Sequence, residues 1–382
     1  MLHVRDSDLV DLTGVRTVGE GVHFGEGQHA PIIPARARVR TAGSARAATR
    51  CSHDGGIPVP EGPVAACMTL GVTLASTRSP HSVDETVRLA REARDAGLHS
   101  AWFGQTFAHD SPMLAAVVGR EVPGLHVGTA ALPVFGRHPL LVSSQAQTAQ
   151  AATGGRYHLG LALGTRHLTE AAFGLPYERP VGLLREFLTA LRPLLETGEA
   201  DFHGELLTAT TPYPAAVPGA RPTVPVLVAA MGPQALKASG ELADGILPFL
   251  AGPRALAEHI VPAVTAAARA AGRPAPRIVA LVPGLVTADP DGVRRRAAEN
   301  LALYERIPSY RRVIGLSGAA RAAELAVLGD EEAVAAEVRR HFDAGATEVV
   351  FTATDLGGED DRRRTWKLLG ELSAERAGGG AG

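Results

Sequence analysis

Short apolar runs alternate with longer amphipathic segments along the chain from Met68 onward. Apolar runs of roughly 4–8 residues are typical of buried strands, whereas apolar positions spaced three and four apart indicate helices. The strand-like runs cover residues 70–74, 100–103, 126–132, 157–163, 226–229, 245–250, 278–286 and 347–352. The helix-like segments cover residues 82–97, 113–119, 140–152, 183–195, 255–271, 291–304 and 331–344, and a further helix is expected after Pro233.

Eight strands that alternate with helices predict a (β/α)8 barrel, the TIM barrel, over residues 68–382. A doubly wound open sheet is the alternative, but no Gly-x-Gly-x-x-Gly follows the first strand. The ends of two helices support a repeated unit. The segments Arg94–Gly97 and Phe342–Gly345 both end in the sequence Asp-Ala-Gly, and a strand follows each of them. Ser82 and Glu85 have the spacing of a capping box at the start of the first helix.

Two stretches depart from this pattern. Residues 1–67 have no sustained helical or strand period and carry scattered Gly, Pro, Arg and Ser, so a disordered extension is predicted there. Residues 198–225 form a long, proline-rich connection. In a compact domain such an insertion loop is more often a functional loop or lid than a simple linker. Within it, Phe202–Glu205 is interpreted as a structural hairpin tip.

The composition is that of a soluble globular protein, with 45% apolar and 20% charged residues. The formal net charge of -2 at pH 7 argues against nucleic acid or an anionic membrane as partner, because both call for a basic face. No apolar run approaches the roughly 18 residues that span a bilayer, and a cytoplasmic location is expected. The cysteines are Cys51 and Cys67, so neither cysteine chemistry nor a metal site is predicted for the barrel.

The segment Ala152–Glu170 carries the densest candidate chemistry. It is interpreted as a helix end, a glycine turn, a short strand and a polar loop that begins at Gly164. Glycine lets the backbone approach a ligand closely, and Thr165 offers a hydroxyl. Histidine is the side-chain type that suits proton transfer near neutral pH, and His167 is the candidate proton donor. A surface histidine without a role is the alternative interpretation.

A second candidate site connects the strand 226–229 to the next helix. Its residues are Ala229, Ala230, Met231, Gly232 and Pro233. Glycine and proline at a helix start leave an N-terminus with free N–H groups and a partial positive charge, which suits a phosphate. An ordinary turn between strand and helix is the alternative.

Several short motifs succeed one another over residues 68–375. They are Trp102–Gly104, Val127–Ala131, Arg137–Pro139, Gly155–Gly160, Gly164, Pro225–Ala230, Gly232–Pro233 and Ala243–Gly245. In order and spacing they resemble the bacterial-luciferase-like family of flavin- and deazaflavin-dependent oxidoreductases. Each motif is weak alone, and together they are specific. The match looks closest to the actinobacterial branch that uses coenzyme F420, a deazaflavin.

The resemblance implies a single barrel with the cofactor over the carboxyl ends of the strands, and frequently a homodimer. Family members have a non-proline cis peptide in a bulge of the third strand, pressed against the ring system. Here it would fall at Ala130–Ala131 or, one residue earlier, at Thr129. The resemblance also implies that Ala229–Pro233 binds the cofactor phosphate and that the loop Gly164–His167 contributes groups to the cofactor or to proton transfer.

The chain departs from the family at the end of the second strand. Several members have an acidic residue and a histidine there, whereas this chain has Gly104-Gln105-Thr106. Gly104 is a candidate cofactor contact, and Gln105 is a candidate catalytic residue that is expected to hydrogen-bond a ring carbonyl. The arginine runs Arg294–Arg296 and Arg311–Arg312 are interpreted as solvated faces, with binding of a poly-glutamate cofactor tail as the alternative.

The predicted function is hydride transfer between coenzyme F420 and an unidentified small organic substrate. One alternative is an FMN-dependent monooxygenase that uses reduced flavin and oxygen. Another is a non-catalytic flavin- or deazaflavin-binding paralogue, because the usual acid and base are missing at Gly104–Thr106.

Overall fold

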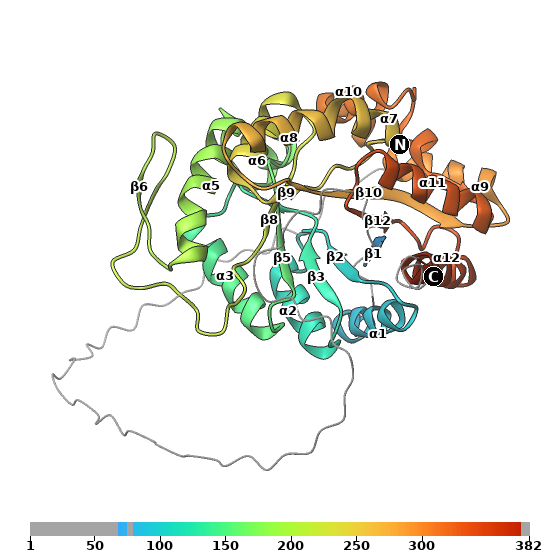
Figure 1. The fold of residues 1–382 in the computed structure, drawn as a ribbon, viewed down its shortest axis with the longest axis horizontal. Helices are drawn as coiled ribbons and strands as arrows, with labels where there is room; N and C mark the ends of the chain where they lie inside the picture. Colours follow the sequence, from blue (N-terminus) through green and yellow to red (C-terminus); the bar gives the residue numbers. More distant parts are fainter. Residues whose placement is uncertain (1–67, 75–78, 376–382) are drawn as a thin grey trace, which may run out of the picture. The chain divides into compact units, whose positions relative to one another are not determined.

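Eight parallel strands close into a barrel in the computed structural model, and the helices surround it (Figure 1). Each strand pairs with the next in the order β1, β2, β3, β5, β8, β9, β10 and β12, and β12 pairs back with β1. These strands are β1 (Thr69–Thr73), β2 (Ser100–Phe103), β3 (His126–Thr129), β5 (Tyr157–Ala162), β8 (Val226–Ala229), β9 (Gly245–Ile246), β10 (Arg277–Val286) and β12 (Glu348–Thr352). The predicted barrel is confirmed, and the open-sheet alternative is wrong because the sheet has closed.

The structure describes residues 68–74 and 79–375. The predicted disordered extension, residues 1–67, lies outside the described residues. None of the helices in the described ranges has the length and apolar character that a bilayer crossing demands.

Proline occupies the first position of α3, α5, α6, α9 and α10. There its missing N–H costs no helical bond and its fixed φ favours the helix. The helices are α1 (Ser82–Asp95), α2 (Ser111–Glu121), α3 (Pro139–Ala152), α4 (Arg166–Phe173), α5 (Pro180–Glu196), α6 (Pro233–Leu242), α7 (Pro253–Ala255), α8 (Val261–Ala270), α9 (Pro290–Leu301), α10 (Pro308–Leu316), α11 (Glu331–Asp343) and α12 (Glu359–Glu375). A π-helical turn, Leu256–Ile260, joins α7 to α8.

The polar loop predicted to begin at Gly164 is wrong over most of its length, because the chain folds there as α4. The Thr165 hydroxyl caps this helix by accepting a hydrogen bond from the Leu168 N–H at 3.3 Å. Three further elements are absent from the sequence prediction, and one of them is α12. The other two are α10 and the short strand β11 (Val327–Gly329), which pairs with the end of β10.

Three other expected elements are also corrected. Ser82 is the first helical residue of α1 rather than its cap, and its hydroxyl lies 3.0 Å from His109 Nε2. The predicted strand 126–132 is interrupted, because β3 ends at Thr129 and a separate strand β4 covers Leu132–Pro133. The predicted strand 245–250 is shorter, since β9 ends at Ile246.

The long insertion contains the predicted hairpin, formed by β6 (Asp201–His203) and β7 (Thr208–Thr210). The Glu186 carboxylate of α5 accepts hydrogen bonds from the N–H groups of Glu205, Leu206 and Leu207 at 3.1, 2.8 and 3.0 Å. These contacts fasten the hairpin tip to α5, on the outside of the barrel (Figure 1).

Apolar side chains fill the barrel interior. The buried cluster consists of Trp102, Leu227, Leu247, Val279, Leu281 and Val350. Ala130, Ala131, Ala229 and Phe249 pack on this cluster and are only partly buried. These four residues follow or end their strands, so they mark the open carboxyl end of the barrel.

A polar network closes the amino end of the barrel beside Trp102. Glu348, the first residue of β12, is 2% exposed. Its carboxylate accepts hydrogen bonds from the Ser100 hydroxyl at 2.5 Å, the Trp102 indole at 3.1 Å and the Arg277 guanidinium at 3.0 Å. A buried carboxylate needs such partners, and here they come from strands β2 and β10.

Three histidines stack against this network. The ring of His99 lies 4.3 Å from that of His126, which lies 5.3 Å from that of His158, between centroids. His158 Nδ1 is 3.2 Å from the guanidinium of Arg277. Burial lowers the pKa of His126 to about 4 and also lowers those of His99 and His158. His126 is therefore neutral at pH 7.

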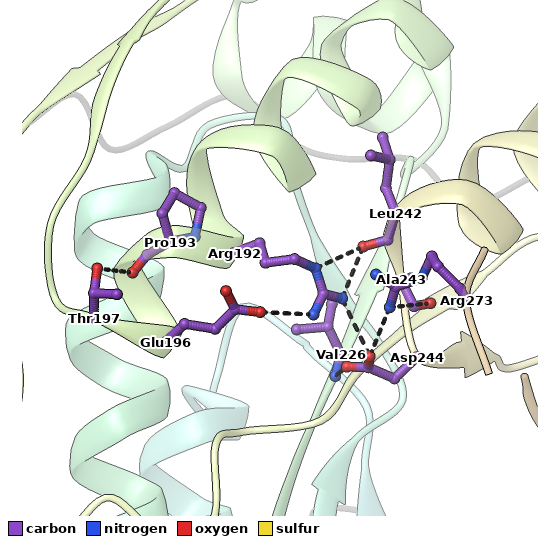
Figure 2. Close-up of polar contacts among 9 residues, drawn as sticks. All are labelled: Arg192, Pro193, Glu196, Thr197, Val226, Leu242, Ala243, Asp244 and Arg273. Atoms are coloured by element: carbon purple, nitrogen blue, oxygen red, sulfur yellow. Dashed lines mark hydrogen bonds and ion pairs between the residues drawn. The ribbon is translucent and has the colours of Figure 1, made fainter. Parts of the chain in front are cut away.

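A second ion cluster holds the amino end of β8 (Figure 2). Asp244 Oδ1 lies 3.2 Å from Arg192 of α5 and 2.9 Å from Arg273, and Asp244 Oδ2 accepts a hydrogen bond from the Val226 N–H at 2.9 Å. Asp244 thus joins two strand starts and a helix at the end of the barrel away from the strand carboxyl ends. The Ala243–Gly245 motif accordingly serves stability.

Replacing Gly160 with alanine is expected to destabilise the barrel. A Cβ there would lie 1.9 Å from the Thr129 carbonyl oxygen, so β5 would have to move away from β3. Denaturant unfolding should show a loss of about 2 kcal/mol or more. Gly315→Ala in α10 is the matched control, because no atom lies within 4 Å of its Cβ position. Equal losses in the two variants would contradict the close approach.

The free energy of unfolding is expected to decrease as the pH falls from about 6.5 towards 4. In that window the unfolded chain protonates its histidines while folded His126 stays neutral, so added protons favour the unfolded state. Denaturant unfolding at a series of pH values measures the slope. His126→Gln should flatten it, and His203→Gln, at an exposed position on β6, should leave it unchanged. A slope that His126→Gln does not alter would refute this assignment.

Candidate functional site

A cavity of about 420 Å³ opens at the carboxyl ends of β5 and β8, and we call it the main cavity. Its lining residues are Ala162, Leu163, Gly164, Thr165, Tyr177, Val181, Ala229, Met231, Gly232, Pro233, Gln234, Ala235, Ile307, Ser309 and Tyr310. None of these residues carries a formal charge at neutral pH. The location is the face at which barrels of this type place their sites.

The starts of four helices contribute to the main cavity. Thr165 is the N-cap of α4, Val181 lies in the first turn of α5, Gly232 is the N-cap of α6 and Ile307 is the N-cap of α10. Each helix start carries a partial positive charge from N–H groups that have no intrahelical acceptor. Four such ends together make an uncharged cavity favourable for an anion.

The start of α6, like those of α5 and α10, has no side-chain cap. Gly232 has no side chain to cap the helix, and no atom lies within 4 Å of its Cβ position. The N–H groups of Gln234 and Ala235 donate to no acceptor within the described residues, and both residues line the cavity. Oxygen atoms of a phosphate placed there would satisfy these donors.

Tyr177 and Tyr310 are the titratable side chains of the main cavity. The Tyr177 hydroxyl donates to the Gly164 carbonyl at 3.3 Å. The ring of Tyr310 meets those of Tyr304 and Phe249 edge-on, at 4.8 and 6.1 Å between centroids. Burial raises the pKa of both Tyr177 and Tyr310, so both hydroxyls are protonated and neutral at pH 7.

A second cavity of about 290 Å³, here called the side cavity, is mostly apolar. Its lining residues are Gln105, Thr106, Phe107, Pro133, Phe135, Gly136, Arg137, Leu168 and Phe173. Phe135 also stacks on Tyr177 of the main cavity, at 4.8 Å between centroids, so the two cavities share a wall. An apolar space beside an anion site suits an organic substrate next to a phosphate-bearing cofactor.

The third strand has the irregularity that the resemblance implies. The Ala130–Ala131 peptide bond is cis, and both alanines lie at the open end of the barrel. Thr129 is fully buried, and its hydroxyl donates to the Gly160 carbonyl at 2.8 Å and accepts from the Gly160 N–H at 2.9 Å. Thr129 thus joins β3 to β5 and offers no free group to a ligand.

Six residues named from the sequence come together in the main cavity. They are Gly164, Thr165, Ala229, Met231, Gly232 and Pro233. Ala230, named with them, is buried and lies outside the lining. Gly104 is exposed and lines neither cavity, although its Cβ position is 3.6 Å from the Ala130 carbonyl oxygen.

The two candidate catalytic residues lie outside the main cavity. Gln105 donates to the carbonyls of Thr106 and His109 at 2.6 and 3.0 Å, and it accepts from the N–H and hydroxyl of Ser111 at 3.0 and 2.9 Å. Its amide is thus used within the loop between β2 and α2, which leaves no donor for a ring carbonyl. His167 is exposed on α4 and lines neither cavity.

Sequence reasoning misses the wall formed by Ile307, Ser309 and Tyr310. The stretch 305–330 has no element assigned to it, although a proline at position 308 is a signal for a helix start. The opposite error concerns residues 198–225, expected to form a functional loop or lid. This segment contributes no residue to either cavity, because its hairpin is held against α5.

The sequence and the fold were compared with those of known proteins. A model of luciferase-like monooxygenases matches residues 66–363. The 5,10-methylenetetrahydromethanopterin reductase of Methanopyrus kandleri is 24% identical over 80% of this chain and 97% of its own.

Two solved structures share the fold. The coenzyme F420 dependent tetrahydromethanopterin reductase from Methanopyrus kandleri has a TM-score of 0.64 and 22% identity, and the match covers 80% of this chain and 98% of that one. The oxygenating constituent of 3,6-diketocamphane monooxygenase from Pseudomonas putida, in complex with FMN, has a TM-score of 0.66 and 14% identity, with 81% and 98% covered. The family model extends from before β1 into α12. The chain therefore belongs to the luciferase-like monooxygenase family.

Proposed function

We propose that this protein is an oxidoreductase that binds coenzyme F420 and exchanges a hydride between the deazaflavin and a small organic substrate. The observation that carries the proposal is the uncapped start of α6, whose free N–H groups at Gln234 and Ala235 open into an uncharged cavity. F420 carries a phosphate that suits this site. The name of the Methanopyrus kandleri reductase, which includes coenzyme F420, supports the choice of cofactor.

An FMN-dependent monooxygenase is the second candidate. FMN also carries a phosphate, and the Pseudomonas putida monooxygenase structure contains FMN. The two candidates differ in the reaction of the bound cofactor, because only the monooxygenase consumes oxygen.

The residues of the chain would hold and orient the cofactor, which when bound supplies or accepts the hydride. The N–H groups of α6 bind the phosphate. The small side chains of Ala130 and Ala131 leave room for a flat ring over the open end of the barrel. The side cavity receives the apolar part of the substrate, and the protonated hydroxyl of Tyr310 is a neutral donor in the main cavity wall.

Purified protein is expected to bind F420 and to change its absorbance in an anaerobic assay with a panel of alcohols, ketones and activated alkenes. Hydride transfer changes the deazaflavin chromophore without oxygen, so the change should need substrate and no air. An enzyme that ignored F420 but consumed oxygen with reduced FMN would refute the main proposal. Tight binding of F420 with no turnover across the panel would favour the non-catalytic paralogue.

Gln234→Glu is expected to weaken binding of FMN or F420 by roughly tenfold, because it places a negative charge beside the phosphate. The same charge favours the start of α6, so the melting temperature should not fall. Fluorescence titration measures the dissociation constants. Riboflavin, which lacks the phosphate, is the ligand control, and Gln234→Asn is the variant control. An equal loss of riboflavin binding would show that the α6 start does not contact the phosphate.

A further inference from the structure

Three arginines beside the main cavity have no polar partner among the described residues. Most other arginines of the described residues have an ion pair or a hydrogen bond to a backbone carbonyl. Arg321, for example, pairs with Glu305 at 3.4 Å, and Arg294 donates to the Ala323 carbonyl at 3.1 Å. The arginines with neither kind of contact are Arg120, Arg221, Arg269, Arg295, Arg306, Arg311 and Arg312. The last three fall within one stretch, 306–312, and all three are exposed.

This stretch is also a wall of the main cavity. Ile307, Ser309 and Tyr310 line the cavity, and Arg306 directly precedes Ile307. Arg311 lies four residues after Ile307 and Arg312 three residues after Ser309. Residues at these spacings are neighbours on a helix surface, so both arginines adjoin cavity-lining positions at the rim.

The local charge is not neutralised within the described chain. Glu305 is the one acidic residue between 302 and 316, and its carboxylate faces Arg321 and accepts a hydrogen bond from the Ala322 N–H at 3.1 Å. Cations at the start of a helix also oppose the helix dipole. Three exposed cations without a partner in the described chain give this stretch a local positive charge.

The phosphate site and the arginine stretch are distinct parts of one surface. The α6 N–H groups suit a single phosphate inside the cavity, and Arg306, Arg311 and Arg312 lie beside lining residues along the stretch 306–312. A ligand that uses both must carry negative charge that continues beyond the phosphate. FMN ends at its phosphate, whereas the side chain of F420 continues through lactate into a chain of glutamates.

We propose that Arg306, Arg311 and Arg312 bind the carboxylates of the oligoglutamate chain of F420 as it leaves the main cavity. The inference rests on the proposed function, because it requires F420 to be the cofactor. Exposed ion pairs are individually weak, but several acting on one flexible polyanion add up, and salt screens them.

The test compares F420 carrying several glutamates with F420 from which the glutamates have been removed, by fluorescence titration at low and high salt. Native protein should bind the glutamylated form roughly three- to tenfold more tightly at low salt, and the difference should shrink at high salt. The double variant Arg311→Gln/Arg312→Gln should lose this difference. The double variant Arg269→Gln/Arg295→Gln, on α8 and α9, is the matched control and should keep it.

Equal affinity of native protein for the two forms would overturn the inference while leaving F420 binding intact. A loss of affinity for both forms in Arg311→Gln/Arg312→Gln would also overturn it, since the arginines would then act on the phosphate or on the fold. If neither form of F420 binds while FMN does, the proposed function is refuted instead. The circular dichroism spectrum and melting temperature of each variant confirm that it is folded.

Discussion

The parallel closure of the strands determines where this protein can bind a ligand. In a parallel barrel each connection leaves a strand at its carboxyl end and starts a helix there, so helix N-termini gather at one rim. Their unpaired N–H groups and partial positive charges gather with them. The main cavity therefore suits an anion although no charged side chain lines it. At α6 the N-cap is Gly232, which has no side chain to cap the helix and leaves its first N–H groups open to the cavity.

The two ends of the barrel handle polar groups in opposite ways. At the amino end, Glu348 is surrounded by donors and Asp244 is shared by two arginines. Polar groups that satisfy one another in this way hold the strand starts in place. At the carboxyl end, the N–H groups of α6 and three arginines of 306–312 have no partner in the described chain. Helix N–H groups that are left open to the main cavity indicate the binding face.

Several residues that carry the family resemblance hold the strands in position. Gly160 lets β5 approach β3, and the Thr129 hydroxyl joins the same two strands. Asp244 holds the start of β8. Other motif residues line the main cavity, Gly164 and Gly232 among them. A motif therefore identifies the family without separating residues that contact a ligand from residues that position the strands.

The sequence by itself determined the eight strands, their order and the turn at Gly232, but not the helix that follows Gly164. These features depend on apolar periodicity, glycine and proline, which act over a few neighbouring residues. Only the tertiary structure decided that Ile307–Tyr310 completes the cavity wall, that the Gln105 amide is used within its own loop and that His167 faces solvent. Those outcomes depend on which distant segments meet when the barrel closes and on the direction in which each side chain leaves its helix. Local spacing carries neither kind of information.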